Sequence, residues 1–206
     1  RLIGLFKNVL KYTCLGNWET REGNANIEET LLTAYLSRRG YTDKEIRSAI
    51  AKFKQAANSL GGGLYNANKE VYTLLRYGVN VQAEVTEKKK MVHLIDWANP
   101  MENDFQIAEE VTIQGESDRR PDLVVYVNGI ALAVIELKRS TVSAHEGIRQ
   151  NIRNQQDGYI PRFFTTIQLL FAGNDTEGLH YGVIKTPEKF WLRWKEPCGE
   201  PCKPSR

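Results

Sequence analysis

Residues 119–138, RRPDLVVYVNGIALAVIELK, contain the clearest indication of the fold. Its two largely apolar runs, 123–127 and 130–137, have the length and composition of buried strands. Asn128-Gly129 separates the runs, and an Asn-Gly pair between apolar segments is a strong signal for a β-hairpin. We therefore expect two antiparallel strands joined by a short turn in the core of the protein.

Three charged residues, Asp122, Glu136 and Lys138, stand at the ends of these expected strands. Charged side chains are seldom buried without a partner or a bound ion. One explanation is a structural ion cluster. The other is a site in which the carboxylates hold a hard cation and Lys138 supports a nucleophilic water. Glu136 and Lys138 are two residues apart, so they project from the same face of a strand.

Whether Asp122 joins that face depends on the turn. A two-residue loop at Asn128-Gly129 points Asp122 away from Glu136. A three-residue loop that includes Val127, with the glycine in the left-handed region and a bulge, pairs Asp122 with Val134 and returns it to the face of Glu136. We predict the bulged loop, because it separates charged from apolar side chains. The apolar face is then expected to contain Leu123, Val125, Ala131, Ala133, Ile135 and Leu137.

The pattern around the hairpin predicts an α/β fold. We expect a strand at Glu110–Gln114, a buried strand at Ile167–Ala172 and a last strand near Tyr181–Ile184. The run Ser143-Ala144-His145-Glu146 has the spacing of a capping box, which opens a helix to about Asp157. Hairpin, helix and strand together indicate a mixed central β-sheet flanked by helices.

The first hundred residues are expected to be mainly helical. Asn24 or Asn26 is the expected cap of the first helix, and Thr42 with Glu45 forms a capping box for the second. The expected elements are helices at about 27–40, from 42 to the glycines 61–63 and at 68–77, followed by short strands at Val79–Val85 and Met91–Trp97.

Composition places few limits on function. The net charge of +3 permits nucleic acid as a partner but does not identify it. No apolar run is long enough to span a bilayer, so we expect no membrane contact. The three cysteines make no disulfide framework, and their odd number favours a reducing, cytoplasmic setting. We expect a helical part at 1–100, a core at 101–195 and a tail or linker at 196–206.

The hairpin carries a specific family resemblance. Pro121-Asp122, followed fourteen residues later by Glu136-Leu137-Lys138, resembles the PD-(D/E)xK nuclease motif. The longer run 119–138 is similar to one group in that superfamily, the restriction (R, or HsdR) subunit of type I restriction-modification enzymes. The resemblance implies a restriction-endonuclease-like fold and a Mg²⁺-dependent endodeoxyribonuclease.

The resemblance also implies roles for individual residues. Asp122 and Glu136 would be Mg²⁺ ligands, with the Leu137 carbonyl as a third, and Lys138 would orient a water or stabilise the transition state. The family often adds an acid from the helix before the sheet. Glu28 and Glu29 both qualify, and we prefer Glu28.

Many members of the family that this chain resembles place a Gln-x-x-x-Tyr pair on the helix after this hairpin, where the glutamine contacts DNA or orients the site. Gln150 has the matching spacing from Glu136, although Asn154 stands where the tyrosine would be. The alternative pair is Gln155 with Tyr159, at the end of the expected helix. We prefer Gln150. The expected phosphate contacts are Arg139, Arg149 and Arg153.

The whole subunit would be larger than this chain if the resemblance holds. No Gly-x-x-x-x-Gly-Lys-Ser/Thr loop is present, so ATP would bind only in a translocase part absent from this chain. The partners would be double-stranded DNA and the modification and specificity subunits. The alternative is a non-catalytic module for nucleic-acid binding or subunit docking, with the three charges as an ion cluster.

Overall fold

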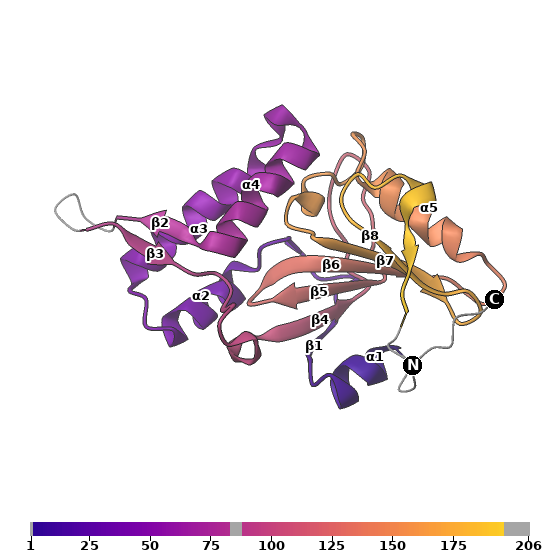
Figure 1. Ribbon diagram of the computed structural model, residues 1–206, viewed down its shortest axis with the longest axis horizontal. Helices are drawn as coiled ribbons and strands as arrows, with labels where there is room; N and C mark the ends of the chain where they lie inside the picture. Colours follow the sequence, from indigo (N-terminus) through magenta and orange to yellow (C-terminus); the bar gives the residue numbers. More distant parts are fainter. Residues whose placement is uncertain (1, 83–87, 196–206) are drawn as a thin grey trace, which may run out of the picture.

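The computed structural model describes residues 2–82 and 88–195, which form a seven-stranded mixed sheet with helices packed around it (Figure 1). The predicted fold class is therefore confirmed. The sheet has the order β1-β4-β5-β6-β7-β8-β9. Its strands are β1 (Thr13–Asn17), β4 (Phe105–Glu109), β5 (Leu123–Val127), β6 (Ile130–Leu137), β7 (Leu169–Asn174), β8 (Gly178–Gly182) and β9 (Leu192–Arg193).

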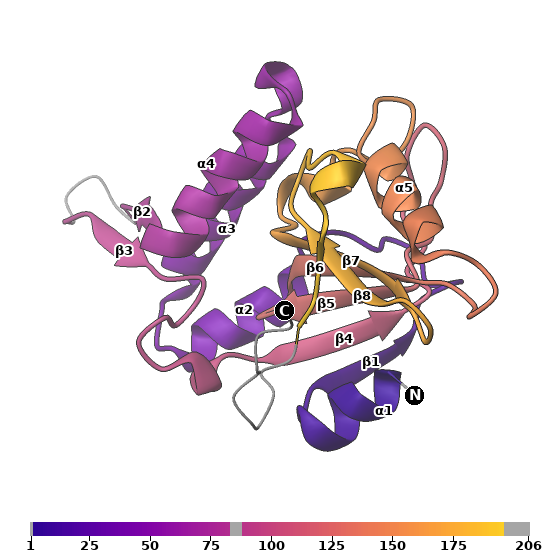
Figure 2. The same ribbon diagram turned by 45° about the vertical axis from the view of Figure 1, so that its right-hand side comes forward.

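Helices α2, α3 and α4 form a lobe beside the sheet, which Figure 2 shows from a second direction. A small antiparallel pair, β2 with β3, extends from this lobe. The helices are α1 (Leu2–Gly4), continued by the π-helical turn η1 (Leu5–Val9), then α2 (Glu29–Arg38), α3 (Asp43–Asn58), α4 (Leu64–Tyr77) and α5 (Ala144–Asn154). The small pair is β2 (Val79–Val81) and β3 (Lys90–Val92). Among the described residues, none of the helices is both long and apolar enough to cross a membrane.

The hairpin turn is shorter than predicted. Val127 pairs with Ile130, so only Asn128 and Gly129 form the loop. Their φ angles are 54° and 80°, and positive φ at both central residues is the requirement of a type I′ turn. The predicted three-residue loop is therefore wrong, because Asn-Gly satisfies the tighter turn without strain.

A bulge nevertheless occurs one step further along the hairpin. Tyr126 pairs with Ala131 and Val125 pairs with Ala133, which leaves Leu132 as an extra residue in β6. Leu132 packs against the core of the helical lobe. Ala131 consequently lies with the side chains under α5 and not on the apolar face predicted for it.

Helix α5 covers one face of the sheet across β6 and β7. A Cβ on Gly147 would lie 3.1 Å from Cβ of Ala172 and 3.4 Å from Cβ of Glu136, so glycine lets the helix approach both strands closely. The Ser143 hydroxyl caps the helix by accepting from the backbone N–H of His145. The predicted reciprocal capping box is absent, because Glu146 pairs with an arginine instead.

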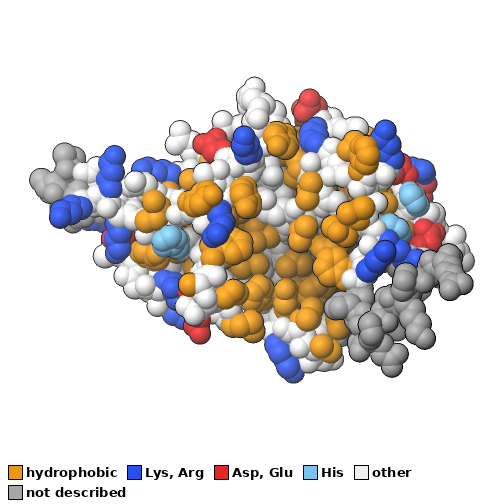
Figure 3. All heavy atoms as spheres, viewed as in Figure 1, with side chains coloured by type: hydrophobic (Ala, Val, Ile, Leu, Met, Phe, Trp, Pro, Cys, Tyr) orange, Lys and Arg blue, Asp and Glu red, His pale blue; other side chains and the backbone are white. Residues whose placement is uncertain are grey.

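The opposite face of the sheet is only partly covered. Leu2, Ile3 and Phe6 of α1 and η1 pack on one end of it. Over the remainder, hydrophobic side chains gather at the surface, as Figure 3 shows in the view of Figure 1. The register aligns Leu192 of β9 with this face, and its side chain is 57% exposed.

The helical prediction for the first half holds for three helices but misses one strand. Thr42 and Glu45 form the predicted capping box at the start of α3. Neither Asn24 nor Asn26 caps α2, which starts after Glu28 without a side-chain cap. β1 was not predicted. It pairs in parallel with β4 at the edge of the sheet, so the first hundred residues contribute to the core.

The boundaries of several strands also differ from the prediction. The strand predicted at Glu110–Gln114 is displaced: β4 ends at Glu109, and Glu110 adopts a left-handed φ of 49°. The last two predicted strands are present as β7 and β8, shifted by about two residues. Residues 83–87, at the end of the strand predicted for Val79–Val85, and the predicted tail 196–206 lie outside the described residues.

Candidate active site at the open end of the hairpin

Asp122 and Glu136 lie opposite each other on β5 and β6. The last registered pair is Leu123 with Ile135, so the next position places Asp122 across from Glu136 on the α5 side of the sheet. Oδ2 of Asp122 also accepts a 2.6 Å hydrogen bond from the backbone N–H of Leu137. The structure therefore brings the two predicted carboxylates together, through a bulge at a different place from the one expected.

Glu136 is fully buried, and neither of its carboxylate oxygens has a hydrogen-bond partner among the described residues. Burial raises the pKa of Glu136 well above its ordinary value of 4.5, and the neighbouring Asp122 carboxylate raises it further, while Lys138 lowers it. A buried carboxyl group without donors is unfavourable in isolation. The site is therefore suited to a positively charged ligand.

Lys138 completes the predicted triplet. Its Nζ lies 4.0 Å from Oε2 of Glu136 and donates a 2.6 Å hydrogen bond to Oε1 of Gln150. Gln150 lies on α5, less than one turn beyond the close approach at Gly147. The lysine is consequently held at the edge of the site, with a fifth of its side chain exposed.

Gln150, and not Gln155, is the helix residue that reaches the site. The Gln155 side chain is buried, donates to the carbonyl of Asn151 and accepts from the backbone N–H of Lys185. Tyr159, its expected partner, stacks under the guanidinium of an arginine in the loop before β5. The side chains of Gln155 and Tyr159 therefore pack within the fold and do not contact the three charged residues.

Neither acid proposed from the helix before the sheet joins the site. The backbone N–H of Glu28 donates to the carbonyl of Gly129, at the turn end of the hairpin. Gly129 precedes Glu136 by seven residues, roughly 20 Å of extended strand. The Glu28 carboxylate is paired with Arg21 at 2.6 Å. The structure therefore does not bring Glu28 to Asp122 and Glu136, contrary to our preference for it.

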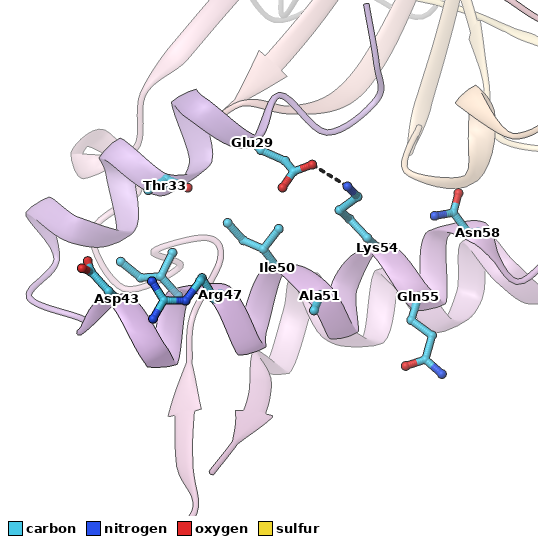
Figure 4. Close-up of a pocket in the computed structure, with 10 residues that line it drawn as sticks. Glu29, Thr33, Asp43, Arg47, Ile50, Ala51, Lys54, Gln55 and Asn58 are labelled. Atoms are coloured by element: carbon cyan, nitrogen blue, oxygen red, sulfur yellow. Dashed lines mark hydrogen bonds and ion pairs between the residues drawn. The ribbon is translucent and has the colours of Figure 1, made fainter. Parts of the chain in front are cut away.

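Glu29 also makes its contacts away from Asp122, Glu136 and Lys138. Figure 4 shows its carboxylate at a hollow between α2 and α3, joined to Lys54 of α3. The volume of that hollow is about 480 Å³, and none of the three charged residues lines it.

One acid that the sequence analysis did not select lies next to Asp122. Glu110 follows β4 directly, and its backbone N–H donates a 2.8 Å hydrogen bond to the carbonyl of Asp122. Its charge is among those that raise the pKa of Glu136. The sequence signal was the acidic pair at the end of the strand 105–109. This acidic pair points to Asp122 only once the register between β4 and β5 is known.

The three arginines predicted to contact phosphate are exposed, and they differ in their partners. Arg149 is engaged by Glu146 and Glu188 in ion pairs. Arg139 and Arg153 form no ion pair within residues 2–82 and 88–195. Arg139 directly follows Lys138 in the chain, so it is the arginine nearest the site in sequence.

The carboxylates can be compared with what a hard divalent cation requires. No group of three or more His, Cys, Asp or Glu side chains is arranged for metal binding within residues 2–82 and 88–195. Two carboxylates, Asp122 and Glu136, remain from the predicted set, and a backbone carbonyl was expected beside them. Oxygen ligands are those that Mg²⁺ prefers, and the unpartnered oxygens of Glu136 fit such an ion.

Known proteins share this sequence pattern. A family model described as "Type I restriction enzyme R protein N terminus" matches residues 2–189. The putative type I restriction enzyme MjaIXP endonuclease subunit of Methanocaldococcus jannaschii is 29% identical over 154 residues, which are 71% of this chain and 14% of that relative. The MjaVIIIP subunit of the same organism is 28% identical over 165 residues, 76% of this chain and 15% of the relative.

A bacterial relative shows the same partial coverage. The type I restriction enzyme SsaAORF53P endonuclease subunit of Staphylococcus saprophyticus is 30% identical over 133 residues, 65% of this chain and 13% of that relative. The chain thus spans 13–15% of the length of these relatives. The family match, in contrast, extends over most of the chain and includes the hairpin, α5 and all three charged residues. The chain belongs to the family of type I restriction enzyme R protein N-terminal regions.

Proposed function

We propose that this chain is a Mg²⁺-dependent DNA endonuclease domain, the cleavage domain of a type I restriction enzyme R subunit. The observation that carries the proposal is the fully buried Glu136 carboxylate, which has no hydrogen-bond donor and faces Asp122. A structural ion cluster would pair its carboxylates closely with cations, whereas Lys138 stands 4.0 Å away and is bonded to Gln150.

Each side chain has a distinct part in this proposal. Asp122 is fixed by the N–H of Leu137, which leaves its other oxygen for a ligand. Glu136 supplies a desolvated carboxylate, because α5 excludes water above it. Lys138, oriented by Gln150, places a positive charge where a phosphate oxygen would develop negative charge.

Asp122 and Glu136 would hold the Mg²⁺ ion. Bound there, the ion would polarise the scissile phosphate and lower the pKa of a bound water. Phosphodiester hydrolysis near neutral pH requires both effects. Glu28 has no part in this arrangement, since its carboxylate is paired with Arg21.

The wider assembly is proposed from the family. Relatives are named endonuclease subunits of type I restriction enzymes and are several times longer than this chain. We infer that the domain acts within a complex with modification and specificity subunits, on double-stranded DNA. ATP would be used by a part of the subunit outside this chain, since the chain has no phosphate-binding loop of the P-loop type.

The test is DNA cleavage by the complete restriction complex carrying Asp122→Asn. Asparagine keeps an oxygen that can accept from Leu137, so the fold should persist while the charge is lost. We expect cleavage to fall by at least about a hundredfold. Asp104→Asn is the matched control, because Asp104 precedes β4 at the opposite end of the sheet and pairs with Arg38.

The rival function makes the opposite prediction. In a non-catalytic binding or docking module, Asp122→Asn would weaken folding or binding and leave cleavage by the complex intact. Unchanged cleavage by a well-folded Asp122→Asn complex would therefore reject the nuclease proposal.

A further inference from the structure

The face of the sheet opposite α5 carries a continuous apolar surface over strands β7, β8 and β9. The register and the alternation of side chains place five residues on it, Leu169, Phe171, Tyr181, Leu192 and Trp194, which together are called the β7–β9 surface. Phe171, Tyr181 and Trp194 are in mutual ring contact, with centroids 5.6–6.5 Å apart. Leu169, Leu192 and Trp194 are nevertheless 40%, 57% and 50% exposed. Figure 3 shows hydrophobic side chains gathered on this side of the molecule.

A hollow continues the β7–β9 surface toward α1 and η1. Its volume is about 680 Å³, and its apolar lining is Leu2, Leu5, Leu137 and Leu179. The backbone N–H of Trp194 donates to the carbonyl of Leu179, so the hollow borders the aromatic cluster. A contiguous apolar surface of this kind on a protein exterior is typical of a site that contacts another protein surface.

The family match indicates what covers this surface. The matching family is described as the N terminus of the R protein, so an R protein has further polypeptide after this region. The relatives are several times longer than this chain, which spans 13–15% of their length. β9 lies just after the matched residues 2–189 and forms the edge of the sheet beside the aromatic cluster. In such a protein, the polypeptide that follows β9 therefore begins at the edge of the β7–β9 surface.

The sequence after β9 does not itself supply a matching apolar surface. Residues 196–206 contain no Val, Ile, Leu, Met or aromatic residue. Burial of exposed apolar side chains requires an apolar partner of comparable size, which a segment of this composition cannot provide. A folded part of the same R protein can.

We propose that the β7–β9 surface is the docking face for the part of an R subunit that follows its N-terminal region, and that it receives an apolar face of that part. The proposal rests on the proposed place of this chain in an R subunit. It does not depend on the chemistry of Asp122 and Glu136.

Hydroxyl-radical labelling of tryptophan, measured by mass spectrometry on the complete R subunit without the other subunits, tests the docking. Trp194 and Trp97 are a matched pair, because they are 50% and 48% exposed and Trp97 contacts the end of α4 instead of the β7–β9 surface. We expect Trp194 to be labelled about fivefold or more slowly than Trp97 in the complete subunit, because the core of an interface excludes water. In this chain alone the two rates should be similar.

A substitution in the surface gives a second readout. Leu192→Glu places a charge in the proposed interface and should restore the labelling of Trp194 in the complete subunit. Met101→Glu is the matched control. Met101 is 86% exposed in η3 (Pro100–Glu102), which precedes β4 near the other edge of the sheet, so Trp194 should stay protected in this variant. Thermal unfolding of both variants checks that they are folded.

The other outcomes overturn the docking proposal. Equal labelling of the two tryptophans in the complete subunit, or protection of Trp194 that persists in a folded Leu192→Glu variant, would show that the surface is not the interface. Protection of Trp194 in this chain alone at every concentration would show that the chain covers its own surface. Protection that grows with concentration, together with a dimer in analytical ultracentrifugation, would show that a second copy occupies it.

The test is independent of cleavage. A complete subunit that protects Trp194 but cuts no DNA within its complex would keep the docking face and reject the nuclease proposal. A complex that cuts DNA while Trp194 and Trp97 are labelled equally would do the reverse.

Discussion

Lys138 Nζ donates a 2.6 Å hydrogen bond to Oε1 of Gln150, which connects the end of β6 to the middle of α5. The contact depends on the close approach of the helix at Gly147, where a Cβ would come within 3.4 Å of Cβ of Glu136. The same packing that buries Glu136 therefore positions Lys138. Orientation of the lysine and desolvation of the carboxylate are two results of one helix–sheet contact.

This contact predicts different effects for substitutions of Gln150, which lies within α5, and Gln155, which lies at the end of that helix. Gln150→Ala should reduce DNA cleavage by the complete complex by about tenfold or more, because Lys138 loses the group that orients it. Gln155→Ala should instead lower the free energy of unfolding by about 1–3 kcal/mol, since its buried side chain satisfies backbone groups of Asn151 and Lys185. Cleavage rates and urea unfolding of both variants give the comparison. Loss of cleavage for Gln155→Ala and loss of stability for Gln150→Ala would instead support Gln155 as the glutamine of the site.

The raised pKa of Glu136 predicts a pH dependence of stability. Below pH 4.5 the carboxyl is protonated in both the folded and the unfolded chain. As the pH rises above 4.5 the unfolded chain releases this proton first, so the free energy of unfolding falls until the pH passes the raised pKa of the folded state. In EDTA, Glu136→Gln should therefore gain stability relative to the wild type as the pH rises toward neutrality. A difference between the two proteins that does not change with pH would contradict this reading.

The hairpin turn predicts a large cost for a methyl group at Gly129. Its φ is 80°, and a Cβ there would lie 2.6 Å from Cβ of Leu31 and 2.8 Å from the Glu28 carbonyl. Gly129→Ala should lower the free energy of unfolding by about 3 kcal/mol or more, from backbone strain and overlap together. Gly40→Ala, with a φ of 82° and open space around the added Cβ, should cost about 1–2 kcal/mol from strain alone. Equal losses would show that α2 does not pack tightly on the turn.

The position of Glu28 predicts a stability effect without an effect on the site. Glu28→Gln breaks the ion pair with Arg21 and should destabilise the fold modestly. Mn²⁺ binding by the chain should be unchanged, because the Glu28 carboxylate is at the turn end of the hairpin. Calorimetric titration with Mn²⁺ distinguishes the cases, and weakened binding by a fully folded variant would restore Glu28 to the site.

The hairpin could be predicted from sequence because its signals are local. Asn128-Gly129 marks the turn, and the two apolar runs match β5 and β6 residue for residue. The position of the bulge could not be predicted. It depends on Leu132 finding space against the helical lobe, which is a long-range contact. The expected meeting of Asp122 and Glu136 was correct in outcome and wrong in mechanism.

The acidic residues around the site show the same limit. Glu28 was selected from the family resemblance, as the glutamate that follows the apolar Ile27. The segment that carries it packs on the hairpin turn at Gly129, and no local pattern reveals that contact. The closeness of Glu110 to Asp122 could not be predicted, because it depends on the register between β4 and β5. Gln150 was selected by its distance in sequence from Glu136. That distance is meaningful here because one short connection joins β6 to α5.

Anomalous diffraction from Mn²⁺-soaked crystals of this chain tests directly whether Asp122 and Glu136 form a metal site. We predict a single strong peak between their carboxylates, with Lys138 directed toward the same space. The same peak should disappear in Asp122→Asn. Crystals that hold Mn²⁺ only elsewhere, with Glu136 still buried and unliganded in the presence of duplex DNA, would contradict the metal-dependent nuclease site.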